Sequence, residues 1–192
     1  MSAAKWYCLS VLTACLLSGT ALAECRVPAF DAFQHPDWAV DQPVRYDDSK
    51  YGFSIAFHGR HAKGTFFIYD YGVSNPEAAD AEEQLKQAVH EVYYIAEKLT
   101  PETVLSDPYL VPEKLYADIG FVDNAVYLTT SSNTGQAVTV ASMGLLHGCF
   151  HKLRYTHPVQ SLETVDISEG LKGFIVLIQE MNDTMTHTNY LK

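Results

Sequence analysis

Apolar and polar residues alternate along residues 51–57, as they do on a strand with one buried face. The apolar positions of this run are Tyr51, Phe53, Ile55 and Phe57. After a turn that contains glycine, the aromatic and β-branched run 65–71 predicts a second strand. The short turn between the two runs predicts a β-hairpin.

The period then changes to that of a helix. Ser74 and Glu77 have the spacing of a capping box, and Pro76 lies between them, as at a helix start. Apolar residues follow at helical spacing as far as about Lys98, with acidic residues mostly on the opposite face. These apolar positions are Leu85, Ala88, Val89, Val92 and Ala96. We therefore expect a long amphipathic helix packed on a sheet.

The second half of the chain returns to strand patterns. Residues 99–118 contain three prolines and predict a long surface connection. Strands are predicted near 117–122, 125–131, 137–146 and 149–156, with a tight turn at His147-Gly148 between the last two. A last helix begins near Asp166, and its apolar stripe is Leu171, Phe174, Ile175, Ile178 and Met181.

These elements predict one α+β domain over residues 51–192, after an irregular lead-in at 24–50. The element order is β-β-α-β-β-β-α. Hairpins dominate this order, so we expect a mainly antiparallel sheet of about five to six strands with two long helices packed on it.

The first 23 residues have the pattern of a secretory signal peptide. Lys5 precedes an apolar stretch, and Ala21-Leu22-Ala23 has the A-x-A pattern of a cleavage site. An alternative is a lipoprotein signal, because Leu12-Thr13-Ala14-Cys15 loosely resembles a lipobox. Cleavage near Ala23 places the mature chain in the periplasm or outside the cell.

Two of the four cysteines remain after such cleavage, Cys25 and Cys149. An even pair in an oxidising compartment usually forms a disulfide. We therefore expect this bond, with two free thiols as the alternative. No later stretch is long and apolar enough to predict a membrane span in the mature chain.

The chain is acidic, with a formal charge of −10 from 13 Lys and Arg against 23 Asp and Glu. This balance argues against nucleic acid or anionic membranes as partners, since both need a dense basic surface. It favours a basic protein partner, such as a toxic enzyme whose basic active site an acidic domain would mask.

Several segments together resemble the PsbP/Mog1-like α/β/α sandwich family, including its DcrB-like bacterial members. The strand Tyr51-Gly52-Phe53-Ser54-Ile55-Ala56-Phe57 fits its "Y-G-F-S-I-x-F" start, and Tyr69-Asp70-Tyr71-Gly72 fits "Y-D-x-G". Residues 150–158 resemble its late "F-x-K-x-R-x-T-x-P" strand. The resemblance covers roughly residues 45–185 and implies binding, assembly or chaperone-like roles. It implies no shared catalytic residues and no cofactor.

Histidines are the best candidates for chemistry. His58 and His61 flank the first hairpin turn, and His147 and His151 flank the last one. If the two turns met in space, four imidazoles could bind Zn²⁺ or Cu²⁺. Alternatively, they are polar turn residues, with His151 hydrogen-bonded on the core side of a strand.

Asp70 is the other candidate for an enzymatic role. A partly buried carboxylate among aromatic residues could have a raised pKa and act as an acid. The structural alternatives are an ion pair with Lys152 or Arg154 and a hydrogen bond to the turn at Gly72. No nucleophile, base and orienting group stand out together, so an enzyme is the less favoured class.

Aromatic and apolar residues in surface segments indicate partner binding instead. Tyr93 and Tyr94 are neighbours on the first helix, so both cannot face the core centre. Tyr109, Leu110 and Val111 lie in the proline-rich connection, where aromatic residues often anchor partners; otherwise they pack this connection onto the domain.

The sequence therefore favours a secreted, non-enzymatic protein-binding domain with an assembly, chaperone-like or inhibitor role in the cell envelope. The alternative is a metal-dependent or carboxylate-based hydrolase that uses the histidine-bearing turns.

Overall fold

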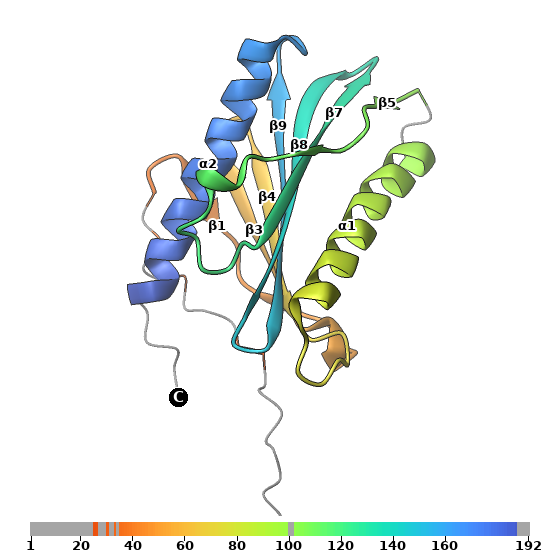
Figure 1. Cartoon of the computed structure of the whole chain (residues 1–192). Coiled ribbons are helices and arrows are strands. Elements are labelled where there is room, and N and C mark those ends of the chain that lie inside the picture. The colour runs from red at the N-terminus through yellow and green to blue at the C-terminus, as the bar shows by residue number, and fades with distance from the viewer. Residues whose placement is uncertain (1–24, 27–29, 31–32, 34, 100–101, 188–192) are drawn as a thin grey trace, which may run out of the picture.

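The computed structural model describes residues 25–26, 30, 33, 35–99 and 102–187, so the predicted signal peptide lies outside the described residues. The chain forms one antiparallel sheet between two long helices (Figure 1). The helices are α1 (Ala78–Leu99) and α2 (Thr164–His187).

The central strands make the long pairings of the sheet. In chain order they are β3 (Phe53–Gly59), β4 (Lys63–Tyr69), β7 (Asn124–Ser132), β8 (Gly135–Leu146) and β9 (Cys149–Val159). The full sheet order is β1-β3-β4-β9-β8-β7-β5, with β2 paired to β3 and β6 paired to β7. Strand β9 thus lies in the middle, between β4 and β8.

Four short strands pair with the outer long strands of the sheet, β3 and β7. They are β1 (Trp38–Val40), β2 (Val44–Arg45), β5 (Val104–Leu105) and β6 (Tyr109–Leu110). Two 3₁₀ turns, η2 (Ser49–Tyr51) and η3 (Glu113–Leu115), lie in the connections. The sheet therefore has nine strands, and the predicted five to six strands were wrong. Strands of two or three residues are too short to show an alternating pattern.

The predicted strand at 117–122 is wrong as well. This segment forms successive turns, in which Ile119 N donates to Tyr116 O and Val122 N donates to Ile119 O. Its apolar side chains are buried in the core on the α2 side, where the Phe121 ring lies 5.3 Å from that of Phe66. The apolar residues of 117–122 thus reflect packing on the sheet and not pairing within it.

Each face of the sheet has its own core. On the α2 side, Phe174, Leu177, Ile178 and Met181 pack against buried residues of β3, β4, β8 and β9. On the α1 side, a smaller cluster joins the first turns of α1 to Tyr69, Phe150 and Met143. The two helices lie on opposite sides of the sheet (Figure 1).

The start of α1 differs from the predicted capping box. The helix begins at Ala78, after Glu77 rather than after Ser74. Asp80 Oδ2 accepts a hydrogen bond from Glu77 N at 2.8 Å, so Asp80 reaches back to the residue before the helix. This bond is the returning half of a capping box, and it lies three residues later in the chain than the predicted box.

The lead-in at 24–50 contributes to the sheet and to the core. It contains β1 and β2, both paired to β3, so it is not irregular throughout. Cys25 forms a disulfide with Cys149, with the two Cα atoms 5.8 Å apart. Beyond it, Phe30 packs edge-on against Phe57 and Phe66, with ring centroids 5.4 Å and 6.2 Å away. The predicted disulfide is confirmed.

Candidate functional site

The four histidines of the metal hypothesis lie at two ends of the sheet. On β4, His58 is paired with Lys63, whereas His151 is paired with Ile68. Five residues of extended chain between these partners correspond to about 16 Å. The β3–β4 turn with His61 and the β8–β9 turn with His147 are therefore at opposite ends. The four imidazoles do not converge, and the proposed shared site was wrong.

Each pair of histidines has its own surroundings. His58 Nε2 lies 2.9 Å from Asp41 Oδ2 on the surface. His61 shares a surface depression with His157, whose pKa is lowered mainly by burial. Within the part of the chain that is described, no three His, Cys, Asp or Glu side chains are grouped so that they could hold a metal ion.

His151 is the buried histidine expected on the core side. It is 3% exposed, and its Nδ1 donates a hydrogen bond to Cys149 O at 3.0 Å. Burial lowers its pKa to about 4, and nearby His147 acts in the same direction, against the Cys149 hydrogen bond. The neutral imidazole is therefore an interior packing group with one satisfied donor.

Asp70 takes the structural alternative. Its Oδ1 accepts a hydrogen bond from Gly72 N at 2.8 Å, within the turn that follows β4. Tyr71 and Gly72 both have positive φ values in this turn, at 57° and 74°. The carboxylate thus stabilises a tight turn, and Lys152 is paired with Glu91 instead.

The predicted partner-binding residues divide into exposed and buried ones. Tyr94 lies exposed on α1, while Tyr109 and Leu110 are 51% and 78% exposed on β6. Val111 was wrongly included, because it is 2% exposed and belongs to the core on the α2 side. Its backbone N donates to Ala125 O, which continues the pairing with β7, and strand alternation points its side chain to the opposite face from that of Leu110.

Tyr93 ties the connection after α1 to the helix. Its hydroxyl donates a hydrogen bond to Ser106 O at 2.7 Å. Tyr93→Phe is expected to lower the free energy of unfolding by about 1 kcal/mol, because one partly buried hydrogen bond is lost. Urea unfolding measures this loss, with Tyr94→Phe as the matched control that should leave stability unchanged. Equal stability of the two variants would contradict the role given to Tyr93.

Sequence reasoning missed a groove on the α1 side of the sheet. On this face, one end of the sheet carries Phe67, Tyr69, Met143 and Phe150, which pack under the first turns of α1. The other end carries hydroxyl and cationic side chains on β4, β9, β8 and β7 under the last turns of the helix. A cavity of about 670 Å³ remains there between helix and sheet, called the α1 groove from here on.

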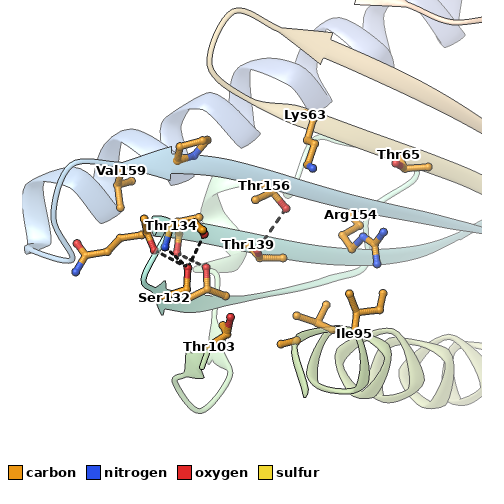
Figure 2. Close-up of a pocket in the computed structure, with 17 residues that line it drawn as sticks. Lys63, Thr65, Ile95, Thr103, Ser132, Thr134, Thr139, Arg154, Thr156 and Val159 are labelled. Carbon is orange, nitrogen blue, oxygen red and sulfur yellow. Dashed lines mark hydrogen bonds between the residues drawn. The ribbon is translucent and has the colours of Figure 1, made fainter. Parts of the chain in front are cut away.

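The α1 groove has an apolar wall and a polar floor (Figure 2). Val92, Ile95 and Ala96 of α1 form the wall. The floor and one end are hydroxyl-rich, and the hydroxyl residues are Thr65, Thr103, Thr130, Ser132, Thr134, Thr139 and Thr156. Thr139 Oγ1 and Thr156 Oγ1 are 3.3 Å apart across β8 and β9. This volume lies in the range of small-ligand sites.

Two cations line the α1 groove, Lys63 on β4 and Arg154 on β9. Within the described chain, no Asp or Glu lines it. The neighbouring cation on the same face of β9, Lys152, has its ammonium 3.0 Å from Glu91 Oε2 on α1. One helical turn further along α1 the residue is Ile95, which offers Arg154 no carboxylate. The α1 groove therefore has a local excess of positive charge, although the chain as a whole is acidic.

The sequence held one signal for this groove. Lys152, Arg154 and Thr156 alternate with buried Leu153 and Tyr155, so the polar face of a central strand could be read. That such a face would lie under a helix and still remain open depends on the tilt of α1, which the sequence does not reveal.

Compared with known proteins, the chain matches no family model and no curated sequence.

No helix among the described residues is both long and apolar enough to cross a membrane.

Proposed function

We propose that this protein is a non-enzymatic domain of the periplasm or extracellular space that binds another protein. The observation that carries the proposal is a set of exposed apolar side chains along β5 and β6, called the edge surface. Its members are Val104, Tyr109 and Leu110, of which Val104 is 70% exposed. These side chains lie on both faces of the sheet edge, because Tyr109 is beside Tyr127 of the α2-side core and Leu110 is beside Val126 of the α1-side cluster. Large exposed apolar side chains at an edge are typical of protein interfaces.

The edge surface is held in place by the sheet behind it. Val104 and Leu105 pair with Ser131 and Thr130, and Tyr109 and Leu110 pair with Tyr127 and Val126. The Tyr109 ring stacks on that of Tyr127, with centroids 5.4 Å apart. Because its backbone is paired, the surface is ordered before a partner arrives, which reduces the entropy lost on binding.

Three further features support the proposal. The signal-like residues 1–23 and the Cys25–Cys149 disulfide suit an oxidising compartment. The resemblance to PsbP/Mog1-like proteins favours binding, assembly or chaperone-like roles. The formal charge of −10 favours a partner with a basic surface, as an inhibitor of a basic enzyme would need.

The test is recovery of partners from an envelope extract by wild type and Leu110→Glu, quantified by mass spectrometry. A charge at Leu110, the most exposed apolar side chain of the edge surface, is expected to reduce recovery of a specific partner about tenfold. Val165→Glu is the matched control, because Val165 is similarly exposed but lies at the start of α2. Equal recovery by both variants, or no partner beyond the proteins bound by a Cys25→Ser/Cys149→Ser control, would contradict the proposal.

A further inference from the structure

We infer that the α1 groove is a binding site for an amphipathic carboxylate, an organic acid with an apolar body. The carboxylate would bind Arg154 and the hydroxyl groups of the floor. The apolar body would lie against Val92, Ile95 and Ala96 of α1. None of the edge-surface residues lines this groove, so the inference does not depend on the proposed function.

Arg154 carries a positive charge that a ligand carboxylate would balance. Arg154 is only partly exposed, and its guanidinium has no hydrogen bond or ion pair within the described chain. Two residues earlier on the same face, Lys152 is paired with Glu91 of α1. The equivalent helix position for Arg154 is Ile95, on the opposite side of the groove (Figure 2). A ligand carboxylate would supply the missing partner in the bidentate geometry that guanidinium groups favour.

Hydroxyl groups and a second cation lie around Arg154 in the groove. Thr65 faces it from β4 as its register partner, and Thr139 and Thr156 lie one pleat further along β8 and β9. Threonine hydroxyls can donate hydrogen bonds to carboxylate oxygens. Lys63 adds a second positive charge at the end of the floor. The floor therefore suits an anion, and it contains no acidic side chain that would oppose one.

The wall of the α1 groove favours a ligand with an apolar body. The wall opposite the floor is apolar, so a simple inorganic anion would leave it exposed to water. The net charge of −10 repels polyanions, and two lining cations balance at most a small negative charge. These features favour one carboxylate on an apolar body. Free fatty acids and apolar peptide C termini both have this chemistry.

The test is isothermal titration of the oxidised full chain with paired probes. Octanoate is compared with octanamide, and acetyl-Ala-Val-Leu with a free carboxylate is compared with its C-terminal amide. We expect the acid of at least one pair to bind about tenfold or more tightly than its amide, as one charge-assisted hydrogen-bonded pair implies. The pair that binds identifies the source, and inorganic phosphate should bind more weakly than that acid.

Two variants then locate the site. Arg154→Gln should remove the difference between acid and amide, whereas the matched control Lys152→Gln should keep it. Ile95→Glu places a carboxylate across the groove from Arg154 and should abolish acid binding while raising the melting temperature. This second variant keeps the inference testable if Arg154→Gln does not fold.

The inference is overturned if acid and amide bind equally or not at all at millimolar concentration. It is also overturned if phosphate binds as tightly as the acids, or if Arg154→Gln and Lys152→Gln weaken binding to the same extent. Leu110→Glu does not alter the α1 groove and should leave acid binding unchanged, whatever its effect on partner recovery. The proposed function and this inference can therefore fail independently of each other.

Discussion

Replacing Cys25 and Cys149 with alanine is expected to lower the free energy of unfolding by about 4–5 kcal/mol. The disulfide closes a loop with a sequence separation of 124 residues. In the chain-entropy account, a cross-link of this span removes conformations from the unfolded chain worth about 4–5 kcal/mol at 25 °C. This is a large fraction of the roughly 5–15 kcal/mol that stabilises a typical domain.

The bond also holds a packed segment in place. Cys25 and Cys149 are buried, and beyond Cys25 the rings of Phe30 and Phe33 pack on Phe57 with centroids 5.4 Å away in both cases. Without the bond, these two rings are held only by their own contacts. We therefore expect the amide of Phe33, which donates to Phe30 O, to lose protection before the amides of the central strands do.

Urea unfolding of the oxidised protein and the double alanine variant measures the loss. Wild type with the disulfide reduced is the matched control, because it has the same change in connectivity without a change in sequence. Both should also show a larger dependence of unfolding free energy on urea, since the open chain exposes more surface. A loss below about 1 kcal/mol in both samples would contradict the constraint assigned to the bond.

The elements that could be predicted from the sequence are those long enough for the strand or helix spacing of apolar residues to repeat several times. β3 alternates over Phe53, Ile55 and Phe57, and α2 repeats its apolar stripe through Phe174 and Met181, so both could be identified. The disulfide could be predicted from compartment and cysteine number alone. The short strands β1, β2, β5 and β6 could not, because their pairing depends on the long strand beside each of them.

The arrangement of the candidate sites also could not be predicted from local sequence patterns. His58 and His151 each lie beside a turn, but only the antiparallel register of β4 shows that these turns are at opposite ends. Val111 and Leu110 are neighbours in sequence, yet one is core and the other edge surface. The α1 groove needs four strands in register and a helix that covers only part of them. Local sequence patterns predict which face of a strand or helix is apolar, but they do not predict which of these faces pack against each other.

Acidification from pH 6.5 to pH 4 is expected to cost this protein about 3 kcal/mol of stability through His151. The imidazole has an ordinary pKa of 6.5, and burial lowers it to about 4 in the folded protein. Between these values the unfolded chain binds a proton that the folded chain excludes, so protonation favours unfolding. A difference of two and a half units corresponds to about 3 kcal/mol.

The surroundings of the ring explain why the folded protein excludes this proton. Nδ1 already donates to Cys149 O, so the added proton must go to Nε2. The ring lies between aromatic neighbours, with centroids 5.6 Å from Phe66 and 6.4 Å from Phe121. A charge placed there loses most of its hydration. The stability is therefore complete above pH 6.5, falls as the pH decreases, and is lost once the pH passes below about 4.

Urea unfolding at a series of pH values between 7.5 and 3.5 measures this dependence, and His151→Gln should flatten it. His58→Gln is the matched control, because His58 lies on the surface beside Asp41 and should leave the buried contribution intact. His157, whose pKa is also lowered by burial, adds a smaller loss in the same direction and remains in both variants. If His151→Gln retains the full acid dependence, the loss arises elsewhere and the buried imidazole is protonated without cost. If His151→Gln removes the acid dependence, this one neutral histidine next to the disulfide sets the lowest pH at which the fold is stable.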